Sequence, residues 1–178
     1  TGTDRVYEAG QKIKSQGVNF DAIINIQGDE PLLPVEYIDL LVQAFQAEPT
    51  LEMATLAHPL DIDDIDNPHA VKVLINQKQF AIYFSRFPIP FSREKNREDL
   101  KQSKSLQKHV GLYGYSMKFL EKFCRQSPTF MEKSESLEQL RALDMGTQIK
   151  VITVPQATHG VDTLEDLKKV ERILKDGK

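Results

Sequence analysis

Two aspartates lie where the chain turns out of an expected β-strand, and side chains in that position can bind ligands. Asp29 follows the apolar run Ala22–Ile26, and Asp162 follows the strand expected over Ile149–Val154. Ligands of α/β sheets bind at the carboxyl ends of strands. Two carboxylates that meet there could hold Mg²⁺, which takes oxygen ligands and is commonly shared between one or two carboxylates and substrate phosphates.

Electrostatics indicates what such a pair of acids could do. A carboxylate about 4 Å from one phosphate charge is repelled by roughly 4 kcal/mol at an effective dielectric constant of about 20. Acidic side chains beside a triphosphate therefore need a cation between them and the phosphates. Two other interpretations stay open at this point: Asp29 as an ordinary turn residue, and Asp162 as a charge that favours a helix terminus.

Length and composition favour one domain over residues 1–178, which the alternation of elements described below makes an α/β domain. The net charge of −3, with Lys and Arg spread along the chain, argues against a nucleic-acid surface. No apolar run approaches the ~20 residues that a membrane span needs, and the polar first residues do not resemble a signal peptide. We therefore expect a cytoplasmic protein with neither a membrane span nor a nucleic-acid partner.

Apolar periodicity predicts alternating helices and strands, and hence an α/β fold with a mixed sheet. A Thr-x-x-Asp helix start at Thr1 and Asp4 predicts the first helix, which Gly17 ends. Further helices are expected from Pro34 to Phe45 and over 118–125, 135–145 and 164–174, and strands over 22–26, 53–60, 70–75, 80–85, 109–117 and 149–154. Residues 91–108 are rich in charge and are expected to form a solvated or mobile excursion.

Seven short strings, in this order and spacing, resemble one family over almost the whole chain. They are Gly2–Arg5, Asn25–Pro31, Asn67–Val73, Tyr83–Arg86, His109–Tyr115, Leu137–Arg141 and Gly160–Thr163. Each string is weak by itself, but together they are similar to the bacterial 3-deoxy-manno-octulosonate (Kdo) cytidylyltransferases, also called CMP-Kdo synthetases.

This resemblance implies a fold and a reaction. The fold would be a Rossmann-like, GT-A-type nucleotidyltransferase core with a smaller mixed sheet that binds the sugar and builds a homodimer. The substrates would be CTP and Kdo, and the products CMP-Kdo, for lipopolysaccharide synthesis, and pyrophosphate. The anomeric hydroxyl of Kdo would attack the α-phosphorus of CTP in line, with Mg²⁺ on Asp29 and Asp162.

The resemblance also implies roles for single residues. Gly2, Thr3 and Arg5 would approach the cytidine, and Gln27 would lie beside the metal and the sugar. Arg86 would bind the Kdo carboxylate through two parallel hydrogen bonds, a geometry that Lys cannot reproduce. The remaining contacts to sugar hydroxyls would come from His109, Tyr113, Glu138 and Gln139.

Each of these side chains also has an ordinary structural interpretation. Arg86 could form a surface salt bridge, His109 could be a satisfied strand histidine, and Tyr113 could pack in the core. Glu138 and Gln139 on a helix would ordinarily be solvated. All of these interpretations stay open until the geometry is known.

Two other functions stay open as well. One is a cytidylyltransferase for another acidic sugar, such as sialic acid or an amino analogue of Kdo. The other is a noncatalytic module that retains the dimer and sugar-binding surfaces. Glycosyltransferases of this fold fit less well, because their Asp-x-Asp motif is replaced here by Gly28-Asp29-Glu30.

One feature of the family has no counterpart in these 178 residues. The resemblance implies a first strand followed by a Gly- and Arg-rich loop and a Lys, which together wrap the CTP triphosphate. No such string occurs here, so we expect an N-terminally truncated form of the fold that lacks the first strand and the phosphate loop. We also expect this chain alone to be weakly active or inactive.

Overall fold

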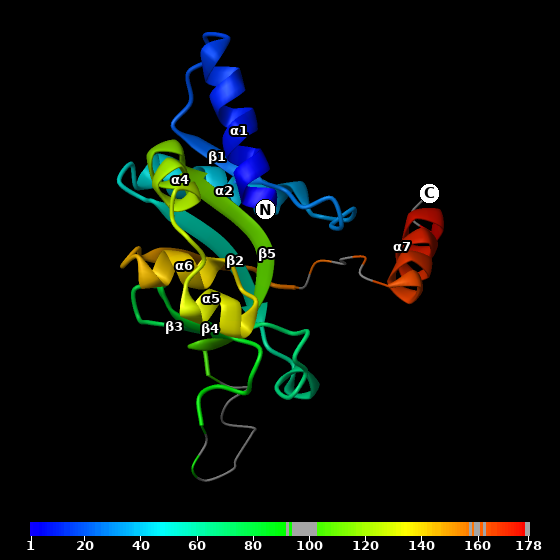
Figure 1. Cartoon of the computed structure of the whole chain (residues 1–178). Helices are drawn as coiled ribbons and strands as arrows, with labels where there is room; N and C mark the ends of the chain where they lie inside the picture. Colours follow the sequence, from blue (N-terminus) through cyan, green and yellow to red (C-terminus); the bar gives the residue numbers. More distant parts are fainter. Residues whose placement is uncertain (92, 94–102, 157, 159–160, 162, 177–178) are drawn as a thin grey trace.

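The computed structural model describes residues 1–91, 93, 103–156, 158, 161 and 163–176. Its centre is a six-stranded mixed sheet (Figure 1). The strands are β1 (Ala22–Asn25), β2 (Met53–Pro59), β3 (Lys72–Ile75), β4 (Ala81–Ser85), β5 (Leu106–Ser116) and β6 (Ile149–Thr153).

The strands follow the order β4-β3-β5-β2-β6, and β1 pairs with the other end of β5. The pair β2 and β6 is parallel, whereas β5 is antiparallel to β1, β2 and β3. The expected α/β class with a mixed sheet is therefore confirmed. The long strand β5 contacts three other strands and so determines where their ends lie.

Helices cover both faces of the sheet. They are α1 (Gly2–Ser15), α2 (Val35–Ala47), α4 (Met117–Cys124), α5 (Phe130–Glu135) and α6 (Gln139–Asp144), with a short 3-10 helix η1 (Ile62–Asp64), whereas α7 (Leu164–Asp176) lies apart from the sheet (Figure 1). The helix α1 begins as predicted, because Thr1 and Asp4 form a capping box that satisfies backbone N–H groups of the first turn. None of the helices in the described ranges is long and apolar enough to cross a membrane.

The core is divided by the sheet into two clusters. Along β2, Met53 and Ala57 belong to the cluster under α4 and α6, whereas Ala54 and Leu56 belong to the cluster under α2. This alternation follows from the two-residue period of a strand, which points successive side chains to opposite faces. The candidate site lies on the α4 and α6 side of the sheet.

The helix expected over 135–145 begins later than predicted, because α5 ends at Glu135 and α6 runs only from Gln139 to Asp144. Ser136 takes a left-handed conformation with φ of 52° and so ends α5. Across this break, Arg141 of α6 donates to Glu132 of α5, with Nε 2.7 Å from the carboxylate. Apolar periodicity does not predict this break, because the ion pair that stabilises it joins residues on two different helices.

The charged segment 91–108 ends earlier than expected. Leu106 and Gln107 are buried in β5, and Lys108 forms an ion pair with Asp64 at 2.8 Å. The start of β5 was missed because charged and polar residues surround the one apolar anchor, Leu106. Residues 92 and 94–102 lie outside the described residues.

Candidate functional site

The site is organised by a bulge in β5. Thr55 of β2 pairs with Tyr113, but the next residue, Leu56, pairs with Val110. One step along β2 therefore corresponds to three steps along β5, which leaves Gly111 and Leu112 as extra residues. Bulges take backbone groups out of the sheet ladder and are frequent beside active sites.

Side chains from two neighbouring segments bind the carbonyls of this bulge. Gln27, on the turn after β1, donates from Nε2 to the carbonyl oxygen of Gly111 at 2.9 Å. The hydroxyl of Thr55 lies 3.2 Å from the carbonyl oxygen of Val110 and 2.8 Å from that of Leu112. Because buried carbonyls need partners, Thr55 stabilises the bulge from inside the fold, and the more exposed hydrogen bond to Gly111 holds Gln27 against β5.

His109 and Tyr113 flank the bulge and form part of a row of aromatic rings. The ring of His109 lies 5.1 Å from Phe84 and 5.3 Å from Tyr113, measured between centroids, and Tyr113 stacks on Tyr115 at 6.0 Å. Burial lowers the pKa of His109 to about 3 and raises the pKa of Tyr113 well above its usual value. Both side chains are therefore neutral near pH 7 and can recognise a ligand by hydrogen bonds, without charge.

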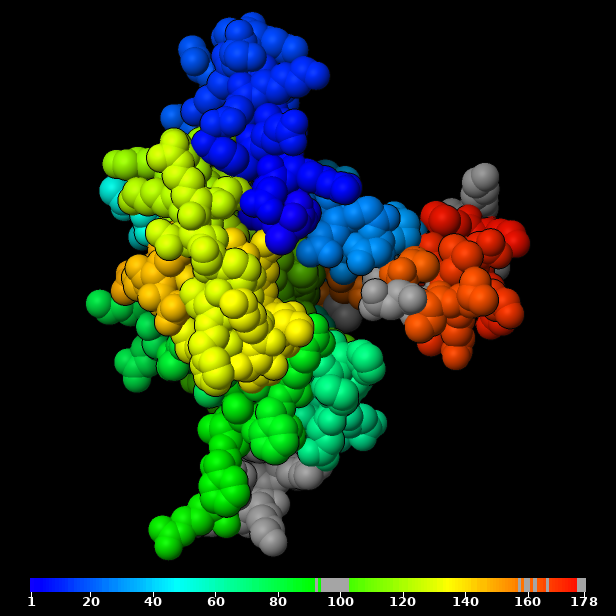
Figure 2. Space-filling view, viewed as in Figure 1, coloured from blue at the N-terminus to red at the C-terminus, as the bar shows by residue number. Residues whose placement is uncertain are grey.

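The start of α6 supplies two polar side chains, those of Glu138 and Gln139. Glu138 accepts a hydrogen bond from the hydroxyl of Thr3 at 2.5 Å, which attaches the first turn of α1 to α6. Figure 2 shows this end of α1 (blue) against the yellow surface of α5 and α6. Burial, then the neighbouring Tyr115 and then the charge of Glu138 raise the pKa of Tyr113, so Glu138 is near enough to act on this ring electrostatically.

Gln139 is buried, with 4% of its surface exposed, so it is not the solvated helix residue of the ordinary interpretation. Its Nε2 has no hydrogen-bond partner within the described part of the chain. A buried donor without a partner costs about 1–3 kcal/mol. A ligand oxygen that accepted from this amide would remove the cost.

Arg86 is held at the end of β4 by neutral acceptors. Its Nε donates to the carbonyl of Glu135 at 2.9 Å, and its Nη1 donates to the carbonyl of Pro68 at 3.0 Å. No ion pair of Arg86 occurs among the residues that the structure describes, so the surface salt bridge considered above is not seen there. The carboxylate of Glu135 accepts from the backbone N–H of Arg86 at 2.8 Å, whereas the guanidinium is oriented by carbonyls and can bind a further anion.

A buried lysine fixes the two loops around Arg86, and sequence reasoning missed it. Lys72 is fully buried, and its Nζ donates to the carbonyl of Asn67 at 2.9 Å and to the carbonyl of Arg86. Burial lowers the pKa of Lys72 because a charged ammonium loses its hydration there. The string Asn67–Val73 contained this lysine, but no local pattern distinguishes it from an exposed one.

Asp29 lies exposed on the turn after β1, and its carbonyl accepts from the backbone N–H of Val161 at 2.8 Å. The next residue, Asp162, lies outside the described residues, so the expected metal pair stays a prediction. Among the described residues, no group of three or more His, Cys, Asp or Glu side chains could hold a metal. An exposed carboxylate at a strand end fits Mg²⁺ whose other ligands are a second carboxylate, phosphates and water.

The other residues predicted to contact the nucleotide lie on α1. Gly2 and Arg5 are exposed in the first turn, whereas Thr3 is buried against α6. The structure joins Thr3 to Glu138 and His109 to Tyr113, and it attaches Gln27 to the bulge between the last two. Arg86 lies two residues after Phe84, whose ring contacts His109. Sequence reasoning missed Thr55 and Tyr115, whose polar groups were indistinguishable from ordinary strand positions.

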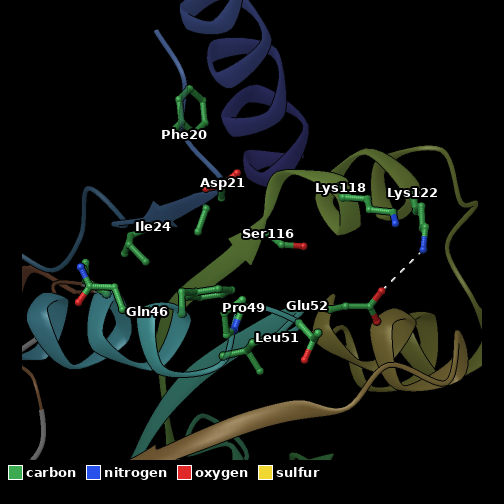
Figure 3. A pocket seen from close by; sticks show the side chains of 14 residues that line it. Phe20, Asp21, Ile24, Gln46, Pro49, Leu51, Glu52, Ser116, Lys118 and Lys122 are labelled. Atoms are coloured by element: carbon green, nitrogen blue, oxygen red, sulfur yellow. Dashed lines mark ion pairs between the residues drawn. The ribbon is translucent and has the colours of Figure 1, made fainter.

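A cavity of about 1020 Å³ lies elsewhere in the molecule, between α2, β1 and α4 (Figure 3). Its lining includes Phe20, Ile24, Phe45 and Leu51, and the ion pair of Lys122 with Glu52 closes one side at 3.7 Å. None of the predicted site residues lines it. The cavity is therefore separate from the polar surface on the α6 side.

Comparisons with known proteins give one consistent result. A family model described as cytidylyltransferase matches residues 1–149. A 3-deoxy-manno-octulosonate cytidylyltransferase of Bdellovibrio bacteriovorus is 48% identical over 174 residues, which cover 98% of this chain and 68% of that protein. Another, of Thermodesulfovibrio yellowstonii, is 42% identical over 178 residues, which cover 98% of this chain and 69% of that protein.

Solved structures agree with these relatives. The structure of CMP:2-keto-3-deoxy-manno-octonic acid synthetase complexed with CTP aligns with a TM-score of 0.88 and 37% identity, over 100% of this chain and 69% of that chain. A putative glucose-1-phosphate thymidylyltransferase of Bacillus anthracis aligns with a TM-score of 0.56 and 17% identity, over 94% of this chain and 60% of that chain. The second likeness concerns the fold alone.

The lowered pKa of His109 predicts a loss of stability in acid. The unfolded histidine binds a proton below about pH 6.5, whereas the folded one binds it only near pH 3, so acidification through this window favours unfolding. Between about pH 7 and about pH 5 the native protein should lose about 1–2 kcal/mol more stability than His109→Gln. Urea unfolding followed by circular dichroism measures the difference.

The control for this prediction is His69→Gln, because the ring of His69 is exposed. That variant should lose the same stability on acidification as the native protein. Equal losses for the native protein and His109→Gln would show that His109 titrates normally in the folded state.

Proposed function

The chain belongs to the 3-deoxy-manno-octulosonate cytidylyltransferase family, and from this membership we infer that it transfers CMP from CTP to Kdo and releases pyrophosphate. It is a nucleotidyltransferase with the fold of the CTP-bound synthetase that it resembles. The sequence-based identification of the family is thereby confirmed. The positions of the substrates and the roles of single residues are proposals, which the geometry supports as follows.

The observation that carries the sugar assignment is an oriented arginine without an acid partner, beside a neutral polar surface. Arg86 would bind the carboxylate of the acidic sugar, since carbonyls hold its guanidinium and leave its charge free. His109, Tyr113 and Gln139 would contact sugar hydroxyls without opposing that negative charge. Glu138, fixed by Thr3, would accept from a hydroxyl at the other end of this surface.

Catalysis would consist of positioning and charge stabilisation. The anomeric hydroxyl of the sugar attacks the α-phosphorus of CTP in line, the new oxygen–phosphorus bond forms, and pyrophosphate leaves. Arg86 and the residues at the bulge orient the acceptor, and Gln27 lies between the sugar surface and the turn that carries Asp29. No covalent enzyme intermediate is required.

Asp29 and Asp162 would hold the Mg²⁺ ion of the reaction. When bound, the ion would neutralise the negative charge of the phosphates, which these carboxylates alone would repel. The backbone hydrogen bond between Val161 and Asp29 supports this pairing, because it joins the segments that carry the two acids.

The nucleotide would lie near the start of α1. Gly2 and Arg5 are exposed there, so the backbone at Gly2 and the positive charge of Arg5 are accessible to a ligand. Arg5 would donate to the base or to a phosphate, whereas the hydroxyl of Thr3 is already bound to Glu138.

The protein would assemble as a homodimer. Its edge strand β4 and the segment that follows expose apolar side chains: Ile82, Phe87 and Phe91 are 58%, 74% and 89% exposed. An edge strand with exposed apolar side chains favours association with another chain. The cytoplasmic location and the supply of CMP-Kdo to lipopolysaccharide synthesis stay predictions.

The reaction is tested by measuring pyrophosphate release with Kdo, sialic acid or an amino analogue of Kdo as the acceptor. We expect release to require CTP and Mg²⁺, to stop when EDTA is added, and to be fastest with Kdo. Rates are compared as ratios between the three acceptors.

Two results would contradict this assignment. Faster release with sialic acid or the amino analogue would show that the chain acts on another acidic sugar. Binding of Kdo without any release of pyrophosphate would indicate a noncatalytic module.

Arg86→Lys tests the carboxylate contact. Lys cannot donate to the carbonyls of Glu135 and Pro68 and also present two parallel N–H groups to a carboxylate. The KM for Kdo should rise about tenfold, with a smaller change in the KM for CTP. Arg125→Lys is the matched control, since Arg125 pairs with Glu121 on the surface of α4. Equal effects of Arg86→Lys on both KM values would remove Arg86 from the sugar site.

A further inference from the structure

The hydroxyl of Thr55 contacts two carbonyls and one histidine nitrogen. Its Oγ1 lies 2.8 Å from the carbonyl oxygen of Leu112, 3.2 Å from that of Val110, and 2.9 Å from Nε2 of His109. Thr55 is fully buried, so no water competes for these contacts. The positions of the protons among these four atoms follow from counting donors.

A threonine hydroxyl has one proton, and a carbonyl oxygen has none. The short distance to Leu112 requires the hydroxyl to donate to the carbonyls, because two oxygen acceptors at 2.8 Å without a proton between them would repel each other. The lone pairs of Oγ1 then face His109. Nε2 must therefore carry the proton that it donates to Thr55.

This proton determines the state of the other ring nitrogen. A neutral imidazole carries one N–H, so Nδ1 of His109 is left as an acceptor. Within the described residues, Nδ1 has no hydrogen-bond partner. Phe84 contacts the ring edge-on at an interplanar angle of 82°, and Tyr113 packs beside it at 41°, which restricts rotation of the ring.

We propose that Thr55 is a positioning residue that holds His109 as the Nε2–H tautomer, so that Nδ1 accepts a hydrogen bond from a hydroxyl of the acceptor sugar. The assignment of the tautomer does not depend on the proposed function, whereas the role of Nδ1 toward the sugar rests on that function. Nδ1 then discriminates between a hydroxyl, which can donate, and an ether or keto oxygen, which cannot. His109 thus recognises one sugar hydroxyl by accepting its hydrogen bond, and it takes up no proton during the reaction.

His58 provides an internal counterpart with the opposite proton position. Its Nδ1 lies 2.8 Å from the carbonyl oxygen of Pro59, which can only accept. Nδ1 of His58 must therefore carry the proton, and Nε2 must be the unprotonated nitrogen. Burial lowers the pKa of His58 as well, so both rings are neutral at about pH 7.

Long-range ¹H–¹⁵N correlation spectra of the protein without ligand, at about pH 7, decide the tautomers directly. We expect a protonated Nε2 and an unprotonated Nδ1 for His109, and the reverse for His58. A protonated Nδ1 in His109, or two averaged nitrogen shifts, would overturn the proposal.

Variants of Thr55 test the positioning step. Thr55→Val keeps the shape and removes the acceptor, so His109 should lose its single tautomer, whereas Thr55→Ser should retain it. The matched control is Thr147→Val, because the buried hydroxyl of Thr147 donates to Glu52 at 3.2 Å, outside the site. An unchanged tautomer in a folded Thr55→Val would overturn the role of Thr55. If Thr55→Val does not fold, loss of the single tautomer of His109 in Thr55→Ser would overturn the role of Thr55 instead.

Kinetics tests the step toward the sugar. In Thr55→Val the KM for Kdo should rise about tenfold while the KM for CTP is unchanged, and Thr55→Ser should restore it. Equal changes in both KM values would show a merely structural role. If the tautomers are as expected but Kdo neither binds nor reacts, the sugar role and the proposed function fail while the positioning by Thr55 stands.

Discussion

The site depends on how the carbonyls of the β5 bulge are hydrogen-bonded. Three consecutive carbonyls, those of Val110, Gly111 and Leu112, are bound by the side chains of Thr55 and Gln27. The two donors come from β2 and from the turn after β1, so the bulge joins both segments to β5. His109 and Tyr113 flank it in sequence and are held on one face as a consequence. A regular strand would need neither side chain and would not hold the turn that carries Asp29.

Buried charge is used for positioning at two places around this face. Lys72 donates to carbonyls of the loops on either side of Arg86, and Arg141 joins α5 to α6 through Glu132. Each cation is costly to bury unless its donors are satisfied. Because both form hydrogen bonds within the fold, they help to orient Arg86 and Glu138 before any ligand binds. The ligand then encounters one oriented positive charge, one half-buried carboxylate and several neutral groups.

Local sequence signals predicted the elements well, because each signal acts within a few residues. The capping box at Thr1 and the hairpin of β3 and β4 are examples. Features that depend on distant contacts were not predicted. They are the break at Ser136, the start of β5 at Leu106, and the bulge in β5, where the hydroxyl of Thr55 contacts three other residues. The candidate site was predicted from the family resemblance, since no spacing rule connects Arg86 with Glu138. The roles of Thr55 and Lys72 became visible only with coordinates, because burial and hydrogen-bond partners decide them.

The central claim is that the acceptor sugar binds against the β5 bulge, and a crystal structure of the protein with bound Kdo tests it most directly. The account predicts the sugar carboxylate on the guanidinium of Arg86 and sugar hydroxyls within hydrogen-bond distance of Nδ1 of His109 and Nε2 of Gln139. A sugar bound in the cavity between α2 and α4, or one whose carboxylate faces away from Arg86, would contradict it.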